Sequence, residues 1–490
     1  MKAISKRLVR NGREVDGDAV SIPGGSTGSA RCRLYTKNEQ FHQRGDARMK
    51  KTIAVWLIVV WALMTVLAGC GKKDDGGGQG TEAGGTTGTS DEPVEIVFYS
   101  SNGDPAESFD YRFGNSIRKK FPNYTIKYIQ STKGNSLPEL IAAGTKFDIF
   151  FISTGNYESM MFDNGLEIDM DPLVKKHNVD LSKLEPTVID GIRQSSGGKL
   201  TGIPVHTNNM VLYYNKTLFD KFGVSYPKDG MTWDEVLELS KKLTRNEGGT
   251  QYYGFTTSAN HLLRMNAYSI PNVDLEKQAP TINANGKWKP FFQTVFLDPF
   301  TDAGYKEQLD KTNKVPDLNA FLKDQNVAMY AYLSSLVYVL PDDLQKLNWD
   351  MVSLPVFKDN PGVGSQSYPF YFGITKLSRH PDEAMNVLNY MISDEFQMEL
   401  AKKGIMPVAK NETVQKALGQ ESPFKDKNFK AVFHNRFAPI PAKAPYDASI
   451  VAIYAKYADQ VIKQKMDINS AFRKAEEEAA KTIAEYKAKK

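Results

Sequence analysis

The stretch FDIFFI, residues 147–152, is the part of the sequence that decides the fold. It is an almost uninterrupted apolar run with the length of one strand, and such runs are typical of strands buried on both faces of a parallel sheet. Two alternating runs precede it, VEIVFYS at 94–100 and TIKYIQ at 125–130, and both are predicted to be strands. A helix is predicted between them at 107–121, ending before Pro122. This strand–helix–strand order indicates an α/β fold with a mostly parallel sheet.

The same alternation continues along the chain. Thr232 and Glu235 form a capping-box pattern, in which each side chain bonds the backbone N–H of the other residue, so a helix is predicted to start there. Ser136 is expected to cap a helix at 137–143. Further strands are predicted at 211–214 and 327–332, and further helices at 381–391, 450–461 and 468–490.

The charge of the chain is concentrated near its N-terminus. The formal net charge is +5, but residues 1–69 carry twelve Lys and Arg against five Asp and Glu, so the remainder has a net charge of −2. A nucleic-acid-binding domain needs a basic patch on its folded part, and this distribution argues against one. The composition, 41% hydrophobic and 24% charged, is that of an ordinary globular protein.

The N-terminal region has the features of a secretory signal. The basic start MKK at 49–51 precedes an apolar run at 53–68, which is short for a membrane-spanning helix of roughly 20 residues. The run ends in LAGC, which resembles the lipobox of bacterial lipoproteins, and Cys70 is therefore expected to carry the lipid, including palmitate. Residues 49–69 are then the signal peptide. Residues 70–93 are the lipidated cysteine and a Gly-rich flexible tether.

Residues 1–48 do not fit this scheme, because a signal peptide normally begins a protein. We expect this extension to be non-native or mis-assigned, with translation starting at Met49. It contains GGSTG at 24–28, which matches the nucleophile-elbow pattern GxSxG. No predicted strand precedes this pentapeptide and no predicted helix follows it, so the match is interpreted as chance.

A set of short phrases in the mature part occurs in an order that resembles one family, the family 1 extracellular solute-binding proteins. These maltose-binding-protein-like receptors serve ABC importers. The resemblance covers the chain from about Val94 to the C-terminus. The phrases are DIFF at 148–151, GIPV at 202–205, VLYYNK at 211–216, TWDE at 232–235, VAM at 327–329, WD at 349–350, LP at 354–355, GIT at 373–375, DEFQ at 394–397 and GIMPV at 404–408.

The resemblance implies a periplasmic-binding-protein type II fold, with two α/β lobes, hinge crossovers and a central ligand cleft. It places lobe 1 at about 94–205 and 355–410 and lobe 2 at about 206–354 and 411–490. The lobes of such receptors close on a ligand by hinge motion. Independently of the resemblance, open α/β sheets bind ligands beyond the carboxyl ends of their strands.

Candidate ligand contacts follow from strand ends, from the crossovers and from the resemblance. A neutral sugar needs aromatic faces against its C–H surface and short polar groups for its hydroxyls. At the position where many relatives have Gly and Trp after the VAM strand, this chain has Leu333, Ser334 and Ser335, so Tyr332 is expected to supply the stacking face instead. Turn capping and core packing are the alternative roles for these residues. The candidates are Asn102, Asp104, Thr154, Asn208, Tyr332, Ser334, Tyr368 and Tyr446.

The function expected from these observations is a lipid-anchored receptor on the outer face of a Gram-positive-type cell membrane. It captures a carbohydrate, with an oligosaccharide favoured, and delivers it to the permease subunits of an ABC importer. We expect a monomer with no cofactor, no metal, no catalytic residue and no nucleic-acid partner. Three alternatives stay open: a ligand-presenting sensor ectodomain, a secreted polysaccharide-active enzyme and a metal-ion receptor. The mature part has no HExxH motif and no phosphate-binding GxxxxGK[ST] loop.

Overall fold

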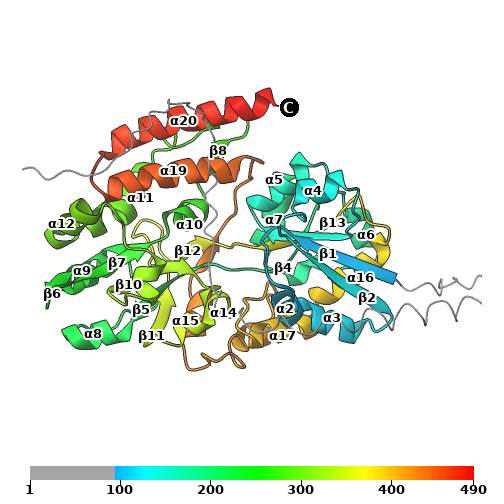
Figure 1. Cartoon of the computed structure of the whole chain (residues 1–490), viewed down its shortest axis with the longest axis horizontal. Helices are drawn as coiled ribbons and strands as arrows, with labels where there is room; N and C mark the ends of the chain where they lie inside the picture. Colours follow the sequence, from blue (N-terminus) through cyan, green and yellow to red (C-terminus); the bar gives the residue numbers. More distant parts are fainter. Residues whose placement is uncertain (1–93, 490) are drawn as a thin grey trace, which may run out of the picture. The chain divides into compact units, whose positions relative to one another are not determined.

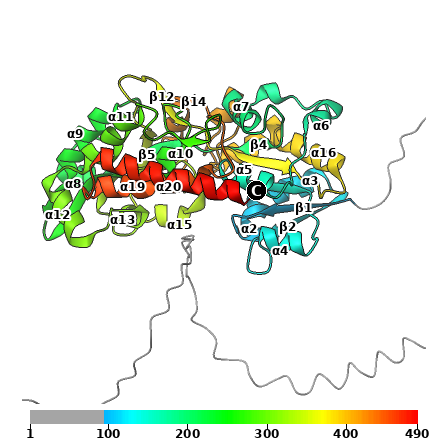
Figure 2. The same ribbon diagram turned by 90° about the horizontal axis from the view of Figure 1, so that it is seen from above.

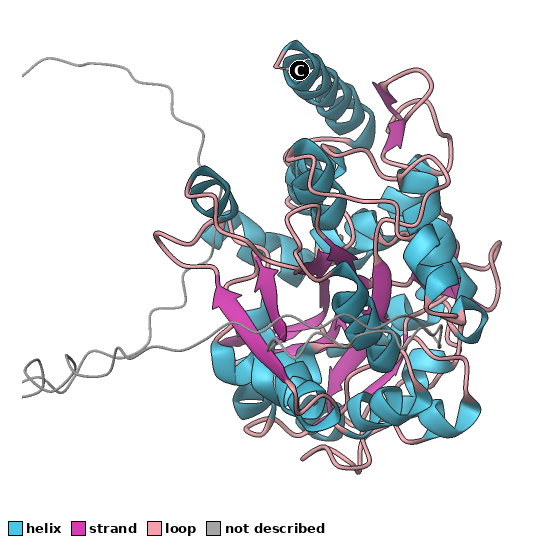
Figure 3. Ribbon diagram, turned by 90° about the vertical axis from the view of Figure 1, so that its right-hand side faces the viewer, coloured by secondary structure: helices cyan, strands magenta, loops and turns pink. Residues whose placement is uncertain are grey.

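The computed structural model describes residues 94–489, which form two lobes with separate sheets and separate hydrophobic cores (Figure 1). Each sheet has five strands and helices against it, and Figure 3 shows helices on both sides of the strands of lobe 1. The first sheet has the strand order β2 (Tyr124–Gln130), β1 (Val94–Ser100), β3 (Ile149–Ser153), β13 (Phe370–Ile374) and β4 (Ile203–His206). The second has the order β11 (Trp349–Ser353), β5 (Met210–Asn215), β10 (Val327–Leu333), β7 (Thr250–Thr257) and β6 (Arg245–Glu247).

The helices of lobe 1 come from two separate parts of the chain. They are α2 (Ala106–Phe109), the π-helix η1 (Asp110–Gly114), α3 (Asn115–Lys120), α4 (Leu137–Ala142), α5 (Asn156–Asp163), α6 (Asp171–Lys176), the 3-10 helix η2 (Leu181–Lys183), α7 (Pro186–Ser195), α16 (Pro381–Met391) and α17 (Asp394–Lys402).

Lobe 2 contains the remaining elements. Its helices are α8 (Lys216–Phe222), α9 (Trp233–Leu243), α10 (Ala259–Arg264), α11 (Trp288–Phe292), η3 (Gln293–Leu297), η4 (Asp298–Phe300), α12 (Ala303–Thr312), α13 (Leu318–Leu322), α14 (Leu336–Val339), α15 (Pro341–Leu344), α18 (Glu412–Lys416), η5 (Phe429–Phe433), α19 (Asp447–Ile462) and α20 (Ile468–Ala488). Two small strand pairs complete the structure: β8 (Val273–Asp274) with β9 (Ala279–Pro280), and β12 (Val363–Gln366) with β14 (Arg436–Ala438).

The strand directions correct one expectation. β1 is parallel to β2 and β3, but β13 runs antiparallel to both of its neighbours, β3 and β4. In the second sheet only the β10–β7 pair is parallel. Both sheets are therefore mixed rather than mostly parallel. In the first sheet only β13 is reversed, and in the second both β5 and β6 run against the other three strands.

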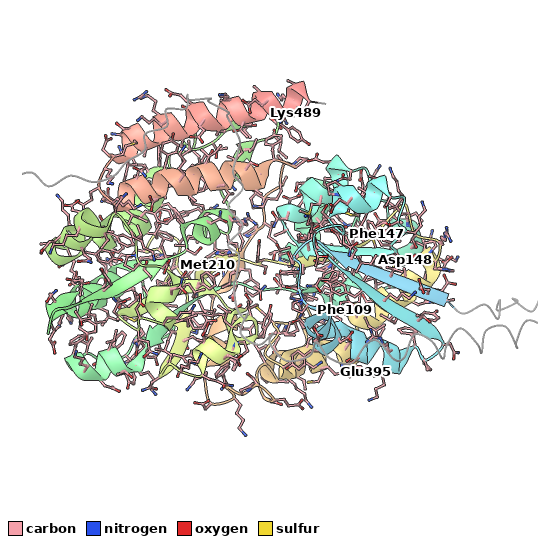
Figure 4. The ribbon with its side chains drawn as sticks, viewed as in Figure 1. Phe109, Phe147, Asp148, Met210, Glu395 and Lys489 are labelled. Carbon is pink, nitrogen blue, oxygen red and sulfur yellow. The ribbon has the colours of Figure 1, made fainter. Side chains whose placement is uncertain are left out.

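Aromatic side chains fill much of the first core. The rings of Phe151 and Phe372, on the neighbouring strands β3 and β13, stack with centroids 4.6 Å apart and an interplanar angle of 3°. Phe109 of α2 stacks in the same way on Tyr128 of β2, also at 4.6 Å. Phe109 and Phe147 are labelled in lobe 1 and Met210 in lobe 2 in Figure 4. Burial of each such ring contributes about 1.5–3 kcal/mol to folding, so these contacts attach α2 firmly to the sheet.

The change from one core to the other is clear at three places in the chain. Val205 belongs to the first core and Met210 to the second, Tyr368 to the second and Tyr371 to the first, and Val408 to the first and Val414 to the second. Phe357 also packs in the second core, so the return to lobe 1 comes after residue 355, the boundary expected from the sequence.

The last two helices lie side by side on lobe 2 (Figure 2). The C-terminal part of α20 extends towards the first lobe, where the hydroxyl of Tyr486 donates a hydrogen bond to the carboxylate of Asp163 at the end of α5. Within residues 94–489, no helix combines the length and apolar character that crossing a membrane requires.

Candidate functional site

A cavity of about 210 Å³ lies between the two lobes. Its lobe 1 wall comes from the loop after β1 and from η1, and its lobe 2 wall comes from the end of β10 and from α14. The two crossovers near residues 208 and 368 close its inner side. The lining residues are Asn102, Asp104, Arg112, Asn208, Tyr332, Leu333, Ser335, Leu336, Tyr338, Val339, Leu340, Tyr368 and Phe370.

The lobe 1 wall carries an ion pair. The Arg112 guanidinium lies 2.5 Å from the Asp104 carboxylate, and its Nε donates to the backbone carbonyl of Ser108, 3.1 Å away. The backbone carbonyl of Asp104 accepts a hydrogen bond of 3.1 Å from the hydroxyl of Tyr128 on β2. The pair is held on both sides, and it presents one group that only donates hydrogen bonds beside one that only accepts them.

The lobe 2 wall is aromatic. Tyr332, near the end of β10, stacks on Tyr330 with centroids 5.1 Å apart, and its ring is also packed edge-on against His261 at 5.2 Å. Tyr338 of α14 donates its hydroxyl proton to the side-chain oxygen of Asn208, at 2.9 Å. Flat apolar faces and fixed hydroxyls thus lie opposite the charged pair.

The two crossovers are paired with each other. The backbone N–H of Asn208 donates to the carbonyl of Tyr368 at 3.2 Å, and the N–H of Tyr368 donates to the carbonyl of Asn208 at 2.7 Å. The hydroxyl of Tyr368 accepts a hydrogen bond of 2.7 Å from Arg264 of lobe 2, and it lies 3.0 Å from the hydroxyl of Ser153 at the end of β3 in lobe 1. Tyr368 therefore links both lobes at the inner side of the cavity.

Four charged side chains are buried behind Tyr368. Arg264 is 8% exposed, and Lys443 and Asp447 approach each other to 4.0 Å, with both side chains 2% exposed. Glu158 of α5 is fully buried and accepts hydrogen bonds from the hydroxyl of Thr154 and the N–H of Gly155. Burial raises the pKa of Glu158 because the low-dielectric interior disfavours its charged form.

His206, at the end of β4, is fully buried between aromatic rings. It stacks on Phe370 at 4.4 Å and lies 5.7 Å from Phe113, and neither ring nitrogen has a hydrogen-bond partner among the described residues. Desolvation, with a smaller contribution from the positive charge of Arg112, lowers the pKa of His206 to about 3. Its imidazole is therefore neutral at physiological pH.

The burial of His206 predicts that the folded protein loses stability in mild acid. The unfolded state binds a proton at His206 near pH 6.5 and the folded state only near pH 3, so stability is lost as pH falls through this interval. At pH 5 the loss is about 2 kcal/mol relative to neutral pH. The variant His206→Phe keeps the ring stacking and cannot bind the proton. Its free energy of unfolding should therefore fall by about 2 kcal/mol less than that of the wild type between pH 7 and pH 5. Urea unfolding at pH 7 and pH 5 measures it, and equal losses in both proteins would contradict the prediction.

Five of the eight candidate ligand contacts line the cavity: Asn102, Asp104, Asn208, Tyr332 and Tyr368. Tyr332 lies near the end of β10, and the other four lie in the segments that follow or precede strands. Arg112 and Tyr338 also line the cavity and were not among the candidates. Arg112 lies eight residues after Asp104, which is the spacing of one face over two helical turns, and this was the available signal for it.

The other three candidates lie outside the lining of this cavity. Thr154 is buried and donates its hydroxyl proton to Glu158. The hydroxyl of Ser334 accepts from the backbone N–H of Asn209 and so fastens β10 to the crossover. Tyr446 is buried in lobe 2, where it donates to Gln278 and contacts the ring of Tyr486 on α20. The candidate lipidation site, Cys70, lies outside the described residues.

Two other grooves are confined to single lobes. One lies over β1 and β2 on lobe 1, and the other lies over α18 and η5 on lobe 2. Hinge closure would not enclose a ligand in either groove, so the interlobe cavity is the stronger candidate. In the part of the chain described here, no three His, Cys, Asp or Glu side chains gather in a way that could hold a metal ion.

Comparisons with known proteins agree with this architecture. Residues 101–398 match the family model described as bacterial extracellular solute-binding protein. The chain is 26% identical over 208 residues to an arabinooligosaccharide-binding protein of Bacillus subtilis, covering 41% of this chain and 43% of that protein. It is 27% identical over 158 residues to an sn-glycerol-3-phosphate-binding periplasmic protein of Brucella abortus, covering 29% and 35%. The matched segments thus span less than half the length of these two relatives.

Solved structures show the same fold. An ABC substrate-binding protein of Listeria monocytogenes in complex with cycloalternan superposes with a TM-score of 0.65 at 19% identity, covering 80% of this chain and 100% of that one. A sugar transporter of Rhizobium etli, in an open conformation, gives a TM-score of 0.62 at 19% identity over 79% and 99% of the two chains. The two-lobed fold expected from the sequence is thereby confirmed.

Proposed function

Because this chain belongs to the bacterial extracellular solute-binding proteins, we propose that it captures an oligosaccharide in the interlobe cavity and delivers it to an ABC importer. The observation that carries the proposal is the cavity itself, where the Asp104–Arg112 pair faces Tyr332 and Tyr338 across the two lobes. Aromatic faces suit the C–H surface of a sugar, and fixed donors and acceptors suit its hydroxyls. The names of the arabinooligosaccharide-binding relative and of the cycloalternan complex support the same class of ligand.

The proposed mechanism is non-covalent. In the open form, each lobe exposes its half of the site, and the solute binds first to one half. Closure about the paired crossovers at Asn208 and Tyr368 brings in the second wall and excludes water. A ligand shifts the protein towards the closed form only through contacts that it makes better there, and the residues that meet across the cavity provide such contacts. The closed form is the one that docks on the permease.

We also propose that the protein acts on the outer face of the cell membrane, attached through lipid on Cys70. The proposal rests on the LAGC sequence after the apolar run at 53–68 and on the hydrophilic tether that follows it. Incubating cells with radioactive palmitate should label the wild-type protein but not the variant Cys70→Ser. Equal labelling of both proteins would contradict the anchor while leaving the receptor function unaffected.

A thermal-shift screen on the chain from Ser90 onwards tests the ligand class. The panel contains mono- and oligosaccharides, polyols, glycerol phosphate, peptides and metal ions. A ligand at 100 times its Kd should add about 2.7 kcal/mol of stability. We expect an oligosaccharide to raise the Tm and to be recovered unchanged. A shift with peptides or metals alone would contradict the sugar assignment, and consumption of the sugar would indicate an enzyme.

A further inference from the structure

A larger groove of about 570 Å³ adjoins the interlobe cavity. The two share four lining residues, Asp104, Arg112, Tyr338 and Val339, so they lie next to each other. One wall is the face of α2 and η1 that includes Tyr111, and the other is α14 with the start of α15. In Figure 1, α14 and α15 of lobe 2 lie on the side towards α2 of lobe 1. The Asp104–Arg112 pair therefore borders both the cavity and the groove.

The walls of this groove expose apolar side chains that folding would otherwise bury. Within residues 94–489, only four large hydrophobic side chains are highly exposed: Tyr111, Ile141, Tyr226 and Val339. Two of the four, Tyr111 at 52% and Val339 at 58%, line this groove, and they come from opposite lobes. Apolar groups that gather in this way at a site rimmed by polar residues mark a binding surface more often than single exposed residues do.

The ring of Tyr111 is held in a defined position. The Nζ of Lys403, at the end of α17, lies 5.1 Å from the ring centroid and donates a hydrogen bond of 2.8 Å to the backbone carbonyl of Tyr111. The ammonium group covers one face of the ring, and the 52% exposure of the residue leaves room for a second group to stack. A positioned aromatic ring beside polar groups is the arrangement that stacks on the C–H face of a sugar.

The inner cavity is small for an oligosaccharide. Its volume of about 210 Å³ is below the range of about 300–1,000 Å³ in which ligand pockets usually fall. The inner cavity is therefore too small for a whole oligosaccharide, whereas the adjoining groove provides space for further units. We propose that the groove is a second ligand subsite, in which Tyr111 and Val339 hold the outer units of a linear oligosaccharide whose terminal unit occupies the inner cavity. This inference rests on the proposed function.

Isothermal titration with arabino-, manno- and maltooligosaccharides of one to five units tests the subsite. For the series that binds, we expect the affinity of the wild type to increase with length beyond one unit. Tyr111→Ala should weaken binding of the longer members about tenfold and leave that of the shortest binding member unchanged. Tyr111→Phe retains the ring and should bind like the wild type. Tyr226→Ala, which removes another exposed tyrosine, at 36%, outside the groove, is the matched control.

The outcomes separate the two proposals. If sugars bind with an affinity that does not depend on length, or if Tyr111→Ala weakens all lengths equally or none, the subsite is wrong while the receptor function stands. If no saccharide binds the wild type, both proposals fail. Thermal unfolding of each variant shows whether it is folded, and a folded Val339→Ser variant with the same length-dependent loss would support the subsite independently of Tyr111.

Discussion

Replacing Gly254 with alanine is expected to destabilise the protein by about 3 kcal/mol or more. Gly254 lies in β7 where the C-terminal turn of α9 crosses the strand. A Cβ atom at this position would lie 2.0 Å from the backbone oxygen of Ser240 and 2.5 Å from its carbonyl carbon. The clash is with backbone rather than with a flexible side chain, so α9 would have to move away from the sheet. The N–H of Gly254 also donates to the hydroxyl of Thr244, at 3.0 Å, and this bond would be strained as well.

Urea unfolding measures this effect, with Gly286→Ala as the matched control. Gly286 belongs to the same lobe, and a Cβ there would meet no heavy atom within 4 Å. The control should therefore unfold within about 0.5 kcal/mol of the wild type. Equal stability of the two variants would show that α9 packs less closely on β7 than the structure indicates.

The second large effect concerns affinity. If the proposed oligosaccharide ligand contacts the charged pair, Asp104→Ala should raise its Kd by about 10- to 100-fold, because a hydrogen bond to a charged group contributes about 1.5–3 kcal/mol. The variant loses the carboxylate acceptor and also releases Arg112 from its partner at 2.5 Å. Its stability should change by less than about 1 kcal/mol, because the pair is partly exposed. Isothermal titration measures the Kd, and thermal unfolding measures the stability.

Asp110→Ala provides the control for this experiment. Asp110 pairs with Arg118 at 2.8 Å in the same helical segment, but this pair borders the groove over β1 and β2 on lobe 1, not the interlobe cavity. Removing it should leave the Kd unchanged. If Asp110→Ala weakens binding as much as Asp104→Ala, the effect comes from the helix as a whole, and the assignment of the cavity is wrong.

Much of the secondary structure could be predicted because local patterns determine it. The strand at 94–100 has the predicted bounds, and the Thr232–Glu235 capping box is formed, with the Glu235 carboxylate accepting from the N–H of Thr232 at 2.7 Å. The helix that starts at Pro381 also has the predicted bounds. The antiparallel direction of β13 was not predictable in the same way, since it depends on the pairing of residues 370–374 with strands more than 150 positions earlier.

Residues that line the interlobe cavity could be predicted where they lie close to strand ends. They could not be predicted where a neighbouring side chain takes the polar group of a candidate. Asp104 and Asn208 lie directly beyond strands and face the opposite lobe. Thr154 occupies an equivalent position after β3, but Glu158, one helical turn later, takes its hydroxyl. Tyr446 lies away from the cavity because it packs against the β8–β9 hairpin and α20, tertiary partners that its own sequence neighbourhood does not reveal.

The position of β13 has a consequence for biosynthesis. β4 pairs in its sheet only with β13, so it cannot join that sheet until residues 370–374 have been made. At 5–20 residues per second, a ribosome needs roughly 10–30 s to travel from His206 to Ile374. During this time, β3 presents an unpaired edge, and the first lobe cannot complete its core. The nascent chain therefore stays available to chaperones and to an export channel, both of which accept unfolded chains, for most of its synthesis.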